Sequence, residues 1–169
     1  MVTSGILERD KRGIYRFASY PDSEFAELWR AVLWPNVSRS TKINELGKGV
    51  LSYATALDLW NVSTINPSKI DITLPKKYRL RRTVPSVYRI HRADLVPKEV
   101  TFIRGLPVTT LYRTLLDLIC DGREQQFVDE VLERTDLLPE SDRRQLKALR
   151  SAGPAKLRDV FMVLGSRAS

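Results

Sequence analysis

The sequence has little of the chemistry on which many enzymes depend. Its 169 residues include one cysteine, Cys120, and one histidine, His91, so no internal disulfide and no cysteine–histidine zinc set can form within it. Gly47-Lys48-Gly49 lacks the partner glycines and the Ser/Thr of a phosphate-binding loop. No Ser-His-Asp arrangement has a recognisable context. We therefore expect a protein that is not an enzyme and that uses no metal or cofactor.

Long apolar runs are also absent. No stretch approaches the roughly 18 consecutive apolar residues of a membrane span, and the N-terminus lacks the pattern of a signal peptide. The sequence therefore predicts a cytoplasmic protein without a membrane partner. A hydrophobic content of 43% is enough for a core, and we expect Cys120, inside an apolar run, to be a buried packing residue.

Acidic residues are missing from one strongly basic segment. Residues 72–93 contain seven basic residues and no acid, whereas the other 147 residues hold 21 basic and 20 acidic residues. Nearly all of the net charge of +8 therefore lies in this segment, which would attract phosphate or an acidic protein surface. A solvated loop that only aids solubility is the alternative. The predicted contact residues are Lys76, Lys77, Arg79, Arg81, Arg82, Arg89 and Arg92.

Alternating apolar and polar residues predict the strands. Residues 5–17 have the pattern of a hairpin with a polar turn, and residues 69–74 and 87–92 predict two half-buried strands that pair across the basic segment. Residues 100–103 and 106–108 predict two more strands around a turn. We expect Lys69, Asp71 and Thr73 to point outward, together with Tyr88 or Arg89 and with His91 or Arg92, depending on the register. His91 is then a surface polar residue, with a phosphate contact as the alternative.

Helical spacing of apolar residues predicts the helices. One begins near Asp22-Ser23 and ends at Pro35, and a second, short helix covers residues 53–60 after a capping Ser52. Thr109 or Thr110 caps a third over residues 111–120. Residues 124–135, 139–150 and 154–164 predict a helical tail. The predicted fold class is α+β, with an N-terminal hairpin and helix, a small mixed sheet with packed helices, and a C-terminal helical tail.

Several ordered blocks resemble the AbiEi-type antitoxins of bacterial type IV toxin–antitoxin systems. The blocks are SYATALDLW at 52–60, PSKIDITLP at 67–75, HRADL at 91–95, GLPVTT at 105–110 and RTLLDL at 113–118. The resemblance implies an N-terminal winged helix-turn-helix that binds promoter DNA, followed by an antitoxin domain that opposes a nucleotidyltransferase toxin. It implies a partial winged helix at 1–35, a connector at 36–50 and an antitoxin domain with its helical tail at 51–169.

The N-terminal part departs from the family pattern. Residues 1–20 match only the end of the winged module, and about two helices that normally precede this point are expected to be missing. A wing alone can touch phosphates but reads little sequence. The wing residues predicted to contact phosphate are Arg9, Lys11, Arg12 and Arg16.

The first functional hypothesis is therefore an antitoxin that neutralises a nucleotidyltransferase toxin, with the basic segment facing the toxin or RNA. The alternative is a DNA-binding autorepressor of the same operon, which would use the wing and the basic segment. A nuclease similar to very-short-patch-repair endonucleases is a third hypothesis. It is disfavoured because no Glu-x-Lys motif follows Ser52.

Overall fold

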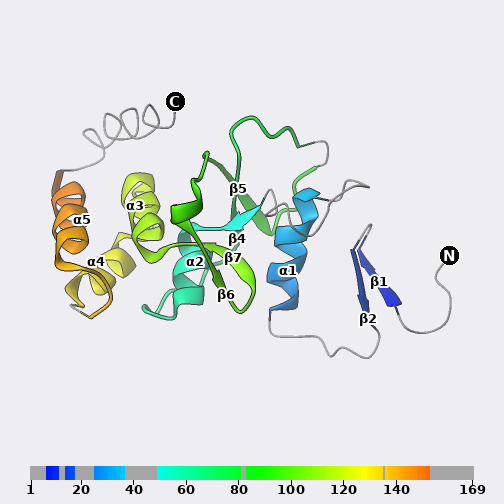
Figure 1. Ribbon diagram of the computed structural model, residues 1–169, viewed down its shortest axis with the longest axis horizontal. Coiled ribbons are helices and arrows are strands. Elements are labelled where there is room, and N and C mark those ends of the chain that lie inside the picture. The colour runs from blue at the N-terminus through cyan, green and yellow to red at the C-terminus, as the bar shows by residue number, and fades with distance from the viewer. Residues whose placement is uncertain are drawn as a thin grey trace. The chain divides into compact units, whose positions relative to one another are not determined.

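The chain is an α+β protein in its computed structural model (Figure 1). The structure describes residues 7–11, 14–17, 25–36, 49–80, 83–134 and 136–152. These residues form five α-helices, a two-stranded sheet and a five-stranded mixed sheet, which confirms the predicted fold class. None of these helices is long and apolar enough to cross a membrane.

The chain is divided into two compact units that alternate along the sequence. The sheet unit comprises residues 1–51 and 69–108, and the helical unit comprises residues 52–68 and 109–169. This division differs from the predicted segments at 1–35, 36–50 and 51–169. The assignment of those segments to a winged-helix remnant, a connector and an antitoxin domain stays a prediction.

The five-stranded sheet has the strand order β5-β4-β3-β7-β6. Its strands are β3 (Val50–Leu51), β4 (Ile70–Leu74), β5 (Tyr88–Arg92), β6 (Val100–Ile103) and β7 (Leu106–Thr109). Strand β3 pairs antiparallel with β4 and parallel with β7, and β4 pairs parallel with β5. The predicted pairing of the two strands that flank the basic segment is therefore confirmed, as are the two strands at 100–109. A tight turn joins β6 to β7, with positive φ at Arg104 and Gly105.

Helix α1 (Ala26–Leu33) belongs to the sheet unit and packs on the sheet. It continues into a 3₁₀ turn, η1 (Trp34–Asn36). A Cβ atom on Gly49 would lie 3.2 Å from Ile72 Cγ2 and 3.3 Å from the Val32 carbonyl oxygen. Glycine at this position thus permits a close approach between the helix end and strand β4. The cap predicted at residues 22–23 lies outside the described residues.

The N-terminal hairpin is present as predicted. Strand β1 (Leu7–Lys11) pairs antiparallel with β2 (Ile14–Phe17), with an irregularity between Arg9 and Lys11. Its role as the wing of a winged helix stays a prediction. Most of the predicted connector, residues 37–48, lies outside the described part of the chain.

The helical unit is built from α2 (Tyr53–Trp60), α3 (Leu111–Asp121), α4 (Gln125–Glu133) and α5 (Glu140–Ala152). Its core includes Leu57, Leu115, Leu118, Val128 and Leu146. These positions follow the helical spacing of apolar residues that predicted the helices. The further helix predicted at 154–164 lies outside the described residues.

Two predicted helix caps in this unit have different outcomes. The Thr110 side chain accepts a hydrogen bond from the Arg113 backbone N–H at 3.4 Å, so the predicted cap of α3 is confirmed. Ser52 occupies the N-cap position of α2, but its side chain makes no capping hydrogen bond there. Cys120 packs against the core of the helical unit and is only partly buried, so the prediction of a buried residue is confirmed only in part.

Candidate binding site: the crossover loop

The basic segment forms the connection between two parallel, adjacent strands. We call residues 75–87, which run from the end of β4 to the start of β5, the crossover loop. Parallel neighbours need such a crossover, and a helix usually provides it. The described parts of this loop, residues 75–80 and 83–87, contain no helix. The loop therefore has to be held in place by individual polar contacts.

The first half of the loop is fixed by its neighbours in the sheet unit. The Arg92 guanidinium donates from Nη1 to the Tyr78 carbonyl at 2.5 Å and to the Pro75 carbonyl at 3.4 Å. Asp94 Oδ1 accepts a hydrogen bond from the Lys76 backbone N–H at 3.0 Å. The Tyr78 hydroxyl donates to the Pro35 carbonyl in η1. These contacts fix the backbone of residues 75–78.

The second half of the loop is fixed where it enters β5. The Ile70 N–H donates to the Val87 carbonyl at 2.9 Å, and the Tyr88 N–H donates to the Pro85 carbonyl at 3.0 Å. The buried Tyr88 ring meets Trp34 edge-on, with ring centroids 5.6 Å apart. Both ends of the crossover loop are thus ordered by contacts within the sheet unit.

The exposed side chains in the described parts of the loop are basic, aliphatic or small and polar, the last including Thr83 and Ser86. Lys76, Lys77 and Arg79 are exposed, as the sequence predicts for partner contacts. Val84 and Val87 are also exposed, at 37% and 52%, and sequence reasoning did not select them. The sequence offers little reason to select these two valines, because single exposed valines are common on protein surfaces. Arg81 and Arg82, predicted in the same set, lie outside the described residues.

The remaining predicted contact residues, Arg89 and Arg92, make contacts within the protein. Arg92 binds the loop carbonyls described above, although its side chain still reaches solvent. Arg89 Nη1 lies 3.5 Å from Asp71 Oδ1, and the Arg89 side chain is 33% exposed. The structure therefore places these two arginines at positions that hold the loop and the strand.

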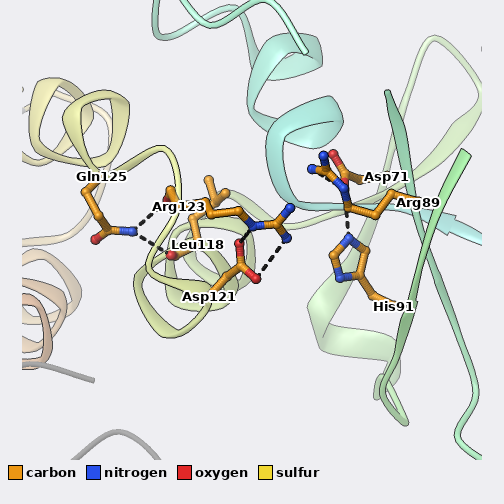
Figure 2. A network of polar contacts seen from close by, with 7 residues as sticks. All are labelled: Asp71, Arg89, His91, Leu118, Asp121, Arg123 and Gln125. Carbon is orange, nitrogen blue, oxygen red and sulfur yellow. Dashed lines mark hydrogen bonds and ion pairs between the residues drawn. The ribbon is translucent and has the colours of Figure 1, made fainter. Parts of the chain in front are cut away.

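Asp71, Arg89 and His91 form a polar cluster on the two paired strands (Figure 2). Asp71 is fully buried, and its Oδ1 lies 2.7 Å from His91 Nε2. The parallel register sets Asp71 beside Arg89 and Thr73 beside His91. Cross-strand pairing thus places the positive charge of Arg89 and hydrogen-bond donors beside the buried carboxylate of Asp71.

This cluster corrects two expectations from the sequence. Asp71 and Thr73 were expected to face outward, but both are buried. His91 was expected on the surface, but only 12% of its side chain is exposed. The alternation rule failed here because it assumes that one face of a strand meets water, whereas all residues from Asp71 to Leu74 are buried.

The helical unit has polar clusters of its own, and each supports its helices. Gln125 Nε2 donates to the Leu118 and Arg123 carbonyls at 2.7 Å, and Arg123 binds Asp121, which closes the junction of α3 and α4 (Figure 2). Within α3, the Arg113 guanidinium binds Asp117 at 2.9 Å in a buried ion pair.

Burial also changes the titration of two groups in the helical unit. It raises the pKa of the Cys120 thiol to about 12, with a further contribution from the Asp117 charge. Burial first, and Asp117 second, raise the pKa of Tyr53 well above its ordinary value. Both groups therefore stay protonated at neutral pH, and Cys120 has little of the thiolate that nucleophilic chemistry requires.

The predicted wing residues are only partly described. Arg9 is exposed on β1, while Lys11 and Arg16 lie on β1 and β2. Arg12 lies outside the described residues. Phosphate contacts by this group stay a prediction.

Comparison of the chain with models of known protein families and with curated proteins gives no match.

Proposed function

We propose that this chain is an antitoxin that neutralises a nucleotidyltransferase toxin by binding it through the crossover loop. The resemblance of its ordered blocks to AbiEi-type antitoxins supports the class of protein. Residues 67–75 and 91–95, two of those blocks, flank the crossover loop on either side. The loop is thus displayed by the part of the chain that carries the resemblance.

The observation that carries the proposal is a basic loop whose described ends are held by hydrogen bonds within the sheet unit. A segment that is held in this way loses little conformational entropy on association, which favours affinity. Lys76, Lys77 and Arg79 project from it without a neighbouring acid in the sequence. Nucleotidyl transfer commonly uses metal ions held by carboxylates, so a toxin of this class presents acidic groups that a cationic loop complements.

The test uses the nucleotidyltransferase encoded beside this chain, in a nucleotide-transfer assay and in a growth-rescue assay. We expect the wild-type chain to suppress transfer and to restore growth. The double variant Lys77→Glu/Arg79→Glu should bind the toxin about a hundredfold more weakly or worse, because like charges at an interface cost several kcal/mol. Transfer and growth that are unchanged by the wild-type chain would refute the antitoxin proposal.

The control variant changes the same two residue types elsewhere. Arg144 and Lys147 are exposed on α5 in the helical unit. Arg144→Glu/Lys147→Glu therefore has the same effect on net charge as the loop variant. We expect it to neutralise the toxin as the wild type does. Equal loss in both variants would mean that net charge, and not the crossover loop, governs binding.

A second function, autorepression of the operon by DNA binding, is favoured by one observation. The N-terminal hairpin is formed, and Arg9 is exposed on it. If about six phosphates are contacted, log K should fall by roughly 0.9 per contact against log salt concentration. A band-shift on the operon's upstream region tests this function. No retardation at low salt, or equal retardation of unrelated DNA, removes specific repression.

A further inference from the structure

The 3₁₀ turn η1 contacts both described ends of the crossover loop. At the first end, the Tyr78 hydroxyl donates a hydrogen bond to the Pro35 carbonyl. At the second end, the loop enters β5 at Tyr88, whose ring meets the Trp34 ring edge-on with centroids 5.6 Å apart. Two consecutive residues of η1 thus hold the two ends of one loop.

The turn η1 has little freedom to move by itself. Helix α1 continues directly into it, and the Trp34 backbone N–H donates to the Arg30 carbonyl. Pro35 is buried, and a Cβ atom on Gly49 would lie 3.3 Å from its Cγ. Closely packed groups transmit a displacement because they cannot be compressed. A displacement of η1 is therefore shared with the end of α1.

Each end of the crossover loop also has a turn of its own. The Tyr78 N–H donates to the Pro75 carbonyl and the Tyr88 N–H donates to the Pro85 carbonyl, both at 3.0 Å. Such turns open readily when few tertiary contacts hold them. The Arg92 guanidinium holds the first turn through the Tyr78 carbonyl at 2.5 Å. Beyond the strands themselves, η1 supplies a link between the two turns.

We propose that η1 is a clamp that makes the end of α1 and the two ends of the crossover loop open and close as one cooperative unit. The inference goes beyond the proposed function, because it holds whichever partner the loop binds. By linkage, a ligand that orders the loop also stabilises the end of α1, and a ligand that stabilises α1 also orders the loop. The clamp is thus a regulatory connection within the sheet unit.

The experiment measures amide hydrogen exchange in the full chain by NMR, which reports the local opening equilibrium at each amide. Tyr78→Phe removes only the hydroxyl that binds η1. The loss of one hydrogen bond predicts exchange about fivefold faster. The clamp predicts the same factor at the amides of Lys76, Trp34 and Tyr88. Tyr112→Phe, on α3 in the helical unit, is the matched control and should leave all three rates unchanged.

A substitution in η1 tests the same link in the reverse direction. Trp34→Leu removes the ring that meets Tyr88. The loss of this aromatic contact predicts exchange about tenfold faster at the Tyr88 amide, and the clamp predicts the same factor at the Lys76 amide at the opposite end of the loop. Trp29→Leu is the matched control. Its ring lies on α1 near Gly105 in the turn between β6 and β7, so both rates should stay unchanged.

The pattern of exchange rates decides the proposal. Equal acceleration at both ends of the loop, with unchanged exchange in β3 and β4, supports the clamp. The clamp is overturned if each substitution accelerates exchange only at the end that it touches, because the two ends then open independently. It is also overturned if neither substitution changes the rates, or if the amides of β3 and β4 accelerate by the same factor, because the whole sheet unit is then destabilised.

Discussion

Replacing Asp71 by asparagine is expected to destabilise the sheet unit strongly, although the side chain keeps nearly the same size. The carboxylate is fully buried, lies 2.7 Å from His91 Nε2 and lies 3.5 Å from Arg89 Nη1. Asparagine retains an oxygen that can accept a hydrogen bond but removes the negative charge. The variant therefore isolates the electrostatic part of the interaction.

The expected cost is about 2–3 kcal/mol. Removing one member of a buried ion pair costs about 3–5 kcal/mol when the other charge stays buried. The Arg89 side chain is 33% exposed, so water can solvate part of its charge. This solvation reduces the cost to the range of a hydrogen bond to a charged group. For a chain of this length, each kcal/mol corresponds to a decrease in Tm of about 2–4 °C.

The assay is urea unfolding followed by circular dichroism and by tryptophan fluorescence. Asp129→Asn is the control, because Asp129 forms a pair with Arg150 at 3.0 Å in which both side chains are substantially exposed. Such a pair contributes less than about 1 kcal/mol. If Asp71→Asn changes the free energy of unfolding no more than Asp129→Asn does, the interpretation of the buried cluster is wrong.

Two further predictions concern pH and backbone conformation. The free energy of unfolding should fall as the pH rises above about 9, because the unfolded chain releases protons from Cys120 and Tyr53 that the folded chain retains through their raised pKa values. The double variant Cys120→Ser/Tyr53→Phe should show a smaller fall in urea titrations at pH 8 to 11. An equal dependence of the free energy of unfolding on pH in the variant and the wild type would contradict this prediction. Gly122→Ala and Gly105→Ala should each cost about 1 kcal/mol in thermal melts, because φ is +78° and +83° at these positions and neither new Cβ would meet a closer neighbour than an ordinary van der Waals contact. Melts unchanged by either substitution would contradict this prediction.

The sequence predicted the elements well because their apolar residues repeat with the correct period. Alternation located β4 and β5, and helical spacing located α3. The partners of polar side chains depend on register, which no single segment encodes. The burial of Asp71 follows from its pairing with β5, and the anchoring role of Arg92 follows from the path of the loop. The charge excess thus identified a candidate surface but could not separate displayed residues from anchoring ones.

The alternation of the two units along the chain has a consequence for the order in which the protein can fold during synthesis. Strand β7 lies between β3 and β6 in the sheet, and Leu51 in β3 pairs with Val108 in β7. The ribosome therefore has to synthesise residues 52–68 of the helical unit before the sheet can close. Contacts between such distant residues slow folding. No single proteolytic cut can release either unit intact, because each unit consists of two segments that are separated in the sequence.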